Sequence, residues 1–77
     1  MFDEFLTKDL SVAGLCYAKG VKLLEVRREG RLCWFVFQNK NRCQDLQQDY
    51  FAKAVEVNAK DYADALRTLK DLVFMRE

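Results

Sequence analysis

Apolar residues in the first part of the chain recur at the spacing of a single helix face: Leu10, Ala13, Gly14 and Tyr17. The polar segment Thr7–Asp9 directly before them offers side chains that cap a helix N-terminus. Gly20 stands where helices commonly end in the left-handed conformation. We therefore predict a first helix over residues 10–18.

The pattern changes between residues 21 and 38 to short runs of valine, leucine and aromatic residues on both sides of a polar segment. If Glu29 and Gly30 form a two-residue turn, counting outward gives an antiparallel β-hairpin in which Val26 lies opposite Cys33. Directly opposed residues share a face of the sheet. The face that we expect to point into the core then carries Leu24, Val26, Cys33, Phe35 and Phe37. A register slip of one residue would exchange the two faces, and the pattern leaves that alternative open.

The second face of this hairpin mixes apolar and charged residues: Val21, Leu23, Leu32, Trp34 and Val36 are interrupted by Glu25 and Arg27. This face is too apolar for plain exposure to solvent and too charged for a fully buried sheet. Three interpretations stay open: burial under a helix of the same chain, contact with a protein partner or a second copy, and stacking of the Trp34 indole on a nucleic-acid base. We expect two helices on the face of Phe35 and Phe37, which would leave the Trp34 face partly open.

The rest of the chain predicts two further helices. Asn39–Asn41 ends the hairpin and caps a helix over residues 42–52, and Asn58 caps a final amphipathic helix. Between them, Val55–Val57 alternates briefly and is expected to add a short third strand to the hairpin edge. The sequence thus predicts a single α+β domain over residues 1–77, an antiparallel hairpin packed against three helices in the order α-β-β-α-(β)-α.

Composition adds a constraint on stability. Hydrophobic residues make up 51% of the 77 residues and charged residues 32%, so the chain can bury a core and is not disordered by composition. A domain of this size buries only about 60–65% of its unfolded surface, which leaves its free energy of unfolding small. Oligomerisation is therefore an alternative from the start.

The formal net charge of +1 argues against a dedicated nucleic-acid-binding protein, which usually carries a clear basic excess. The predicted hairpin tip nevertheless gathers Arg27, Arg28 and Arg31, which are candidate contacts to phosphates. Glu25 and Glu29 lie in the same segment and lower its net positive charge. We therefore favour a protein contact over a nucleic-acid contact.

Candidate catalytic groups are few. The chain contains no histidine, which excludes Ser-His, Cys-His and imidazole–metal sites. Cys16, Cys33 and Cys43 are odd in number, form no CxxC pair and fall on predicted core positions, so we expect reduced, inert thiols in a cytosolic compartment. The carboxylates that share a helix face form two pairs, Asp45 with Asp49 and Asp61 with Asp64. These pairs fall on polar helix faces, so we expect no enzymatic activity, no catalytic residues, no metal and no cofactor.

Two further observations lead to an expected cellular compartment. The N-terminal residues are acidic and lack the basic segment and apolar run of a signal peptide, and the sequence holds no apolar stretch of 18 residues. We therefore expect a cytoplasmic protein that does not span a membrane.

Several short motifs occur in a characteristic order along the chain: Thr7-Lys8-Asp9-Leu10, Ala18-Lys19-Gly20, Phe35-Val36-Phe37, Tyr50-Phe51 and Val57-Asn58. Over roughly residues 6–74 this pattern resembles a family of short bacterial and phage proteins catalogued as a domain of unknown function. The chain departs from the family at Asn58-Ala59, where an Asp-Pro pair is common, and at Gln38, where an acidic residue is common. The resemblance implies a mobile-element or prophage setting, and it carries over no activity and no catalytic residue.

The sequence therefore predicts a small cytosolic, non-enzymatic protein-interaction module that binds a protein partner or a second copy. The surface we expect to mediate this contact consists of Leu23, Leu32, Trp34 and Val36. One alternative is a nucleic-acid-binding accessory protein that uses Arg27, Arg28 and Arg31. A second alternative, an inhibitor of a host system, follows only from the mobile-element setting.

Overall fold

The computed structural model describes residues 3–75, and its elements follow one another as β1 (Glu4–Thr7), α1 (Leu10–Ala18), β2 (Leu23–Glu29), β3 (Leu32–Gln38), α2 (Lys40–Phe51) and α3 (Ala59–Met75). The predicted α+β class, with an antiparallel hairpin and three helices, is confirmed. The first helix has the predicted bounds, and the second begins two residues earlier than predicted. Of the predicted domain, residues 1, 2, 76 and 77 lie outside the described residues.

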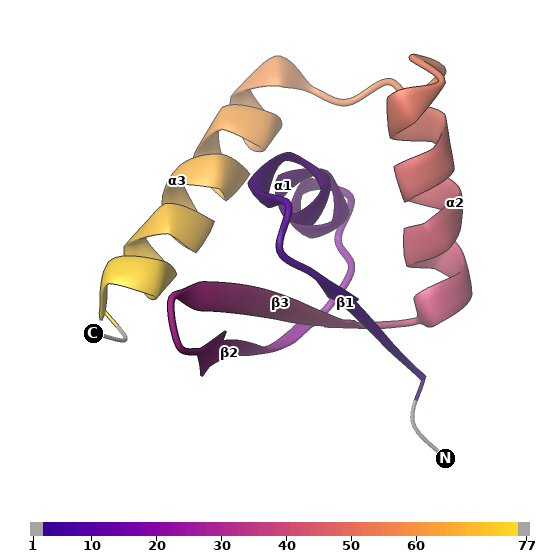
Figure 1. The fold of residues 1–77 in the computed structure, drawn as a ribbon. Coiled ribbons are helices and arrows are strands. Elements are labelled where there is room, and N and C mark those ends of the chain that lie inside the picture. Colours follow the sequence, from indigo (N-terminus) through magenta and orange to yellow (C-terminus); the bar gives the residue numbers. More distant parts are fainter. Residues whose placement is uncertain (1–2, 76–77) are drawn as a thin grey trace.

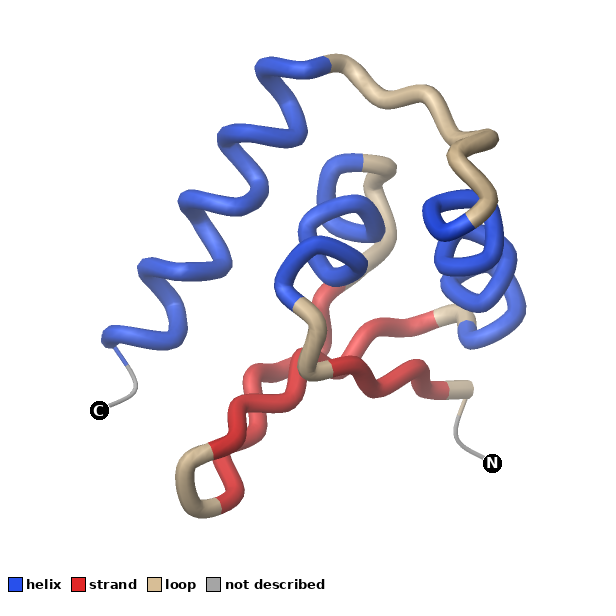
Figure 2. The backbone as a smooth tube through the Cα atoms, turned by 45° about the horizontal axis from the view of Figure 1, so that its top comes forward, coloured by secondary structure: helices blue, strands red, loops and turns tan. Residues whose placement is uncertain are grey.

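All three helices lie on one side of the sheet, as the two views in Figures 1 and 2 agree. The strand order is β1-β3-β2, so β3 is the central strand. The buried core lies between the sheet and the helices, and its members from the sheet are Phe5, Val26, Phe35 and Phe37. The expectation that only two helices cover this face is wrong. Because α2 begins directly after the cap residue that follows β3, the chain has no connection long enough to carry α2 to the other face.

The third strand of the sheet is β1, which the sequence pattern did not predict. It pairs with β3 in antiparallel register, with Phe5 opposite Phe37 and Leu6 opposite Val36. The segment Val55–Val57, which was expected to supply this strand, instead belongs to the loop between α2 and α3. β1 occupies the edge of β3 that the hairpin leaves free, so the third strand comes from the beginning of the chain.

The hairpin register differs from the prediction by two residues. Val26 lies opposite Phe35, and the loop consists of Gly30 and Arg31 rather than Glu29 and Gly30. Gly30 has a φ of 62° and takes the first central position of the turn, as type II′ turns require. Because a shift of two residues preserves the alternation of side chains, Phe35 and Phe37 still point into the core.

A β-bulge interrupts β2 near its beginning. Leu23 lies opposite Phe37 and Glu25 lies opposite Val36, so Leu24 is an extra residue on this strand. The bulge reverses the predicted places of the two leucines: Leu23 packs against the core, and Leu24 is exposed. The sequence pattern cannot show such an insertion because both residues are leucine.

The predicted helix caps are present. The Asn58 side chain accepts hydrogen bonds from two backbone N–H groups of the first turn of α3, both at 3.0 Å. The Asn39 side chain accepts one at 3.3 Å at the start of α2, and Asp9 accepts two, at 2.9 and 3.4 Å, at the start of α1. These side chains satisfy donors that a helix N-terminus otherwise leaves unpaired. Within residues 3–75, no helix combines the length and the apolar character needed to cross a membrane.

Candidate functional site

We call the side of the sheet that faces away from the helices the outer face. The strand register assigns to it Leu6, Leu32, Trp34 and Val36, together with Glu25, Arg27 and Glu29. No helix of residues 3–75 covers this face (Figure 1). An uncovered sheet face that carries tryptophan, leucine and valine is a candidate contact surface.

Of the four residues expected to form the interaction surface, Leu32, Trp34 and Val36 share the outer face and Leu23 does not. Trp34 is on the outer face and is half-buried, and the Lys8 Nζ lies 5.9 Å from the centroid of its ring. Val36 is on the same face but is 0% exposed. Leu32 is exposed beside the hairpin loop, whereas Leu23 packs into the core as described above.

Two residues of this surface were missed by the sequence analysis. Leu6 is 40% exposed and lies directly beside Val36, and Leu24 is 41% exposed at the bulge. The adjacent apolar residues Phe5 and Leu6 do not alternate with polar ones, and four residues are too few to identify a strand from periodicity. The apolar part of the outer face therefore consists of Leu6, Leu32, Trp34 and Val36, with Leu24 at its margin.

The edges of the sheet are poor sites for pairing with another strand. β1 has four residues, and β2 carries a bulge together with the charged residues Glu25, Arg27, Arg28 and Glu29. Short edge strands, bulges and charges are the features by which proteins prevent edge-to-edge association. The outer face, rather than an edge, is thus the part of the sheet suited to a partner.

The three arginines of the hairpin tip do not form one basic surface. Arg27 lies on the outer face, and its Nη2 donates a hydrogen bond to the Glu25 Oε2 at 2.6 Å, which raises the pKa of Arg27. Arg28 is the next residue along β2 and lies opposite Cys33, on the other face. Arg31 is in the loop and lines a groove on the helical side. The structure therefore separates these guanidinium groups instead of aligning them along a phosphate backbone.

The cysteine thiols are not activated for nucleophilic chemistry. Burial, together with the neighbouring Cys43, raises the pKa of Cys16 from 9.0 to about 12. Burial also raises the pKa of Cys43, whose Sγ donates to the Gln38 carbonyl oxygen at 3.6 Å. A reactive cysteine requires the opposite, a thiolate stabilised by its surroundings. Both thiols serve as small apolar groups in the core, as the sequence predicted, and Cys33 is half-buried next to it.

The carboxylates are likewise arranged as surface groups. Asp64 pairs with Lys60 one turn earlier on α3, with 3.4 Å between Oδ2 and Nζ, and Asp45 and Asp49 are exposed on α2. Across residues 3–75, no group of three or more Cys, Asp and Glu side chains is placed to hold a metal ion.

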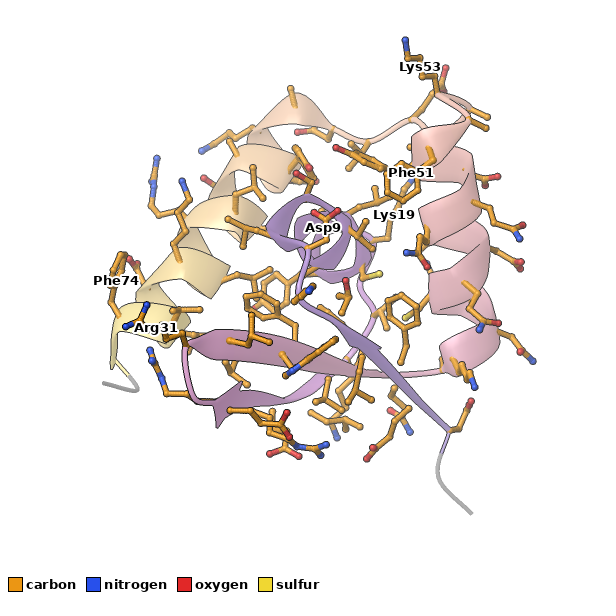
Figure 3. All side chains as sticks on the ribbon, viewed as in Figure 1. Asp9, Lys19, Arg31, Phe51, Lys53 and Phe74 are labelled. Atoms are coloured by element: carbon orange, nitrogen blue, oxygen red, sulfur yellow. The ribbon has the colours of Figure 1, made fainter. Side chains whose placement is uncertain are left out.

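A groove of about 600 Å³ opens on the helical side of the molecule, between the end of α3 and the hairpin loop. Its apolar lining consists of Leu10, Leu32, Cys33, Phe35, Val73 and Phe74, and its charged lining consists of Lys8, Arg31 and Lys70. Figure 3 shows Arg31 and Phe74 near each other where the hairpin approaches the end of α3. The sequence analysis did not identify this groove.

Comparison with known proteins identifies the family. The family described as a domain of unknown function (DUF5659) matches residues 3–75, so the chain belongs to it. This confirms the resemblance to a catalogued domain of unknown function. Searches of curated proteins and of solved structures found no match.

Proposed function

We propose that this protein, a member of the DUF5659 family, is a small non-enzymatic interaction module of the cytosol that binds a protein partner through its outer face. The observation that carries the proposal is the uncovered sheet face on which the exposed Leu6 and Leu32 and the half-buried Trp34 present apolar side chains. Interface centres are enriched in aromatic residues and depleted in charge, and Trp34 supplies such a centre. The buried cysteine thiols support a reducing compartment, because a chain with three cysteines cannot pair all of them.

The charges around the apolar centre support a specific contact rather than general adhesion. Glu25 and Arg27 already pair with each other, and Lys8 lies over the Trp34 ring. A partner that covers the apolar centre therefore leaves these charges at the rim, where they stay accessible to water. This arrangement of an apolar centre inside a polar rim is typical of protein interfaces.

The test compares the wild type with Leu6→Asp and with Phe51→Asp, which changes an exposed phenylalanine of α2 that is not part of the outer face. Each protein is used as bait in a bacterial lysate, and its own self-association is measured by sedimentation. We expect a stoichiometric partner, or a second copy, that Leu6→Asp loses and Phe51→Asp retains. A complex that survives Leu6→Asp, or equal loss in both variants, would contradict the proposal.

The second candidate function, nucleic-acid binding, has one observation in its favour. Lys8 and Arg27 both lie next to Trp34, so the outer face combines an aromatic ring with two cations, as surfaces that bind single strands do. On this hypothesis the wild type retards single-stranded DNA in a gel at low salt, and replacing Arg27, Arg28 and Arg31 by Ser weakens the shift. Absence of a shift at low salt would dismiss it. The third possibility, an inhibitor of a host system, rests on the resemblance alone.

A further inference from the structure

The groove between α3 and the hairpin is a second surface, which shares Leu32 and Lys8 with the outer face. Phe35 of β3 and Leu10 of α1 are among its lining residues, and Leu32 and Phe74 stand at its exposed border. Phe74 is 68% exposed, the highest value among the exposed large hydrophobic side chains of the described residues. Exposed apolar side chains that border a concave apolar site indicate a ligand that is itself partly apolar.

Among residues 3–75, the charged residues that line the groove are all of one sign. Arg31 comes from the hairpin loop, Lys70 from α3 and Lys8 from the segment before α1. Lys8 is shared with the outer face, because its Nζ lies over the Trp34 ring. Within the described part of the chain, Arg31 and Lys70 are therefore the two cations that belong to the groove alone.

We propose that this groove binds a short linear peptide segment in which an apolar anchor side chain is flanked by acidic residues. The anchor lies on the apolar lining between Leu32 and Val73, and the flanking carboxylates pair with Arg31 and Lys70. This inference goes beyond the proposed function, since it adds a second binding site on the opposite side of the sheet and names the chemistry of what it takes.

The positions of the cations favour a peptide over a small amphipathic acid. A fatty acid or similar molecule carries one anionic group, whereas Arg31 and Lys70 come from different walls of the groove. A peptide with a carboxylate on each side of its apolar anchor can pair with both cations, whereas a ligand with one anionic group can pair with one of them. The groove is also open to solvent, and small ligands generally bind in pockets that bury most of their surface.

The experiment selects binders from a displayed library of random short peptides, with the full-length wild-type protein as the target. The library is first depleted on the double variant Arg31→Glu/Lys70→Glu. We expect the enriched sequences to share an apolar residue with Asp or Glu on both sides. One enriched peptide is then labelled with fluorescein, and its affinity for each variant is measured by anisotropy.

Two groups of variants test the two parts of the site. Arg31→Ala and Lys70→Ala each weaken binding by about two- to fivefold, the range of one exposed ion pair, and binding also weakens as salt rises. Phe74→Ser weakens binding through the apolar part, and because Phe74 is largely exposed the variant remains folded. Lys53→Ala is the matched control, since it removes a lysine that points away from the molecule at the end of α2 (Figure 3).

The inference fails if depletion leaves no sequence that prefers the wild type, or if the enriched sequences lack acidic residues. It also fails if the groove variants bind the peptide as tightly as Lys53→Ala does. Leu6→Asp on the outer face must leave peptide affinity unchanged. A peptide lost with Leu6→Asp and kept by the groove variants would overturn this inference and leave the proposed function standing.

Discussion

Lys53 occupies at the end of α2 the position that Gly20 occupies at the end of α1. Both residues have positive φ, 60° for Lys53 and 87° for Gly20. In each helix this residue and the next donate backbone hydrogen bonds to carbonyls of the last turn, at 3.1 and 3.0 Å after α1 and at 3.2 and 2.8 Å after α2. This is the Schellman motif, in which glycine is the usual residue because side chains strain the left-handed conformation.

The first prediction is that Lys53→Gly stabilises the protein by about 1 kcal/mol, because it relieves this strain without removing a contact. Gly20→Ala is the matched control and should lower the free energy of unfolding by a similar amount. A methyl group on Gly20 meets no atom within 4 Å, so its effect is confined to the backbone. Urea denaturation of the two variants measures both changes. A destabilised Lys53→Gly would show that the lysine makes a contact worth more than the strain.

The second prediction concerns the centre of the sheet. Phe37 is 0% exposed between β1 and β2, so Phe37→Ala should cost about 3–5 kcal/mol, which is comparable to the whole stability of a domain this small. Phe51, which is 63% exposed and contacts the Tyr50 ring edge-on, is the matched control, and its replacement by Ala should cost far less. Circular dichroism during thermal unfolding compares the variants. Equal costs for the two positions would contradict the assignment of the core.

The third prediction concerns the contact of α1 with α3. A Cβ atom on Gly14 would lie 2.5 Å from the Leu66 Cδ2 and 3.4 Å from the Tyr62 Cε1. Gly14→Leu should therefore cost about 1–3 kcal/mol or more through overpacking. Gly14→Ala should cost less, because Leu66 is only half-buried and can move, and because alanine favours the helix by about 1 kcal/mol. Chemical denaturation distinguishes the two, and a leucine tolerated as well as alanine would show that the helices separate easily.

Features that depend on neighbouring residues were predictable from the sequence. Asn39 and Asn58 cap helices because their side chains bond to backbone groups two or three residues away. The alternation in Leu32–Gln38 placed Phe35 and Phe37 on the core face even though the turn was assigned one residue too early. Periodicity of 2 survives an error of two residues in register, so the faces were correct along β3, and the pairs were not.

Features that depend on distant parts of the chain were not predictable. Glu4–Thr7 is a strand only because β3 offers it an unpaired edge, and this edge lies about thirty residues away in sequence. The bulge at Leu24 arises from the pairing of β2 with β3. Two consecutive leucines in the sequence give no local sign of it. The groove depends on the distance between the hairpin loop and the end of α3, which brings Arg31 beside Phe74. Such relationships arise from tertiary packing. The spacing of apolar residues along the sequence carries no information about them.

The fourth prediction follows from the raised pKa values of the buried acids. Burial raises the pKa of Cys16 from 9.0 to about 12 and raises the pKa of Cys43 in the same direction. Burial also raises the pKa of Tyr62, whose hydroxyl donates to the Ser11 carbonyl oxygen at 3.0 Å. In the unfolded chain these groups lose their protons near their ordinary values, so the unfolded state binds fewer protons than the folded state in this range.

Stability should therefore be unaffected by these groups below about pH 9 and should fall as the pH rises from about 9 to about 12. Urea denaturation across this range measures the slope of the free energy of unfolding against pH. Cys16→Ala/Cys43→Ala lowers the stability at every pH because it leaves cavities, but its slope should be shallower, and adding Tyr62→Phe should flatten it further. At neutral pH a disulfide reagent should react with Cys33, which is half-buried, well before Cys16 and Cys43. Equal slopes in wild type and variants, or equal reaction rates at the three thiols, would mean that water reaches Cys16 and Cys43 in the folded protein.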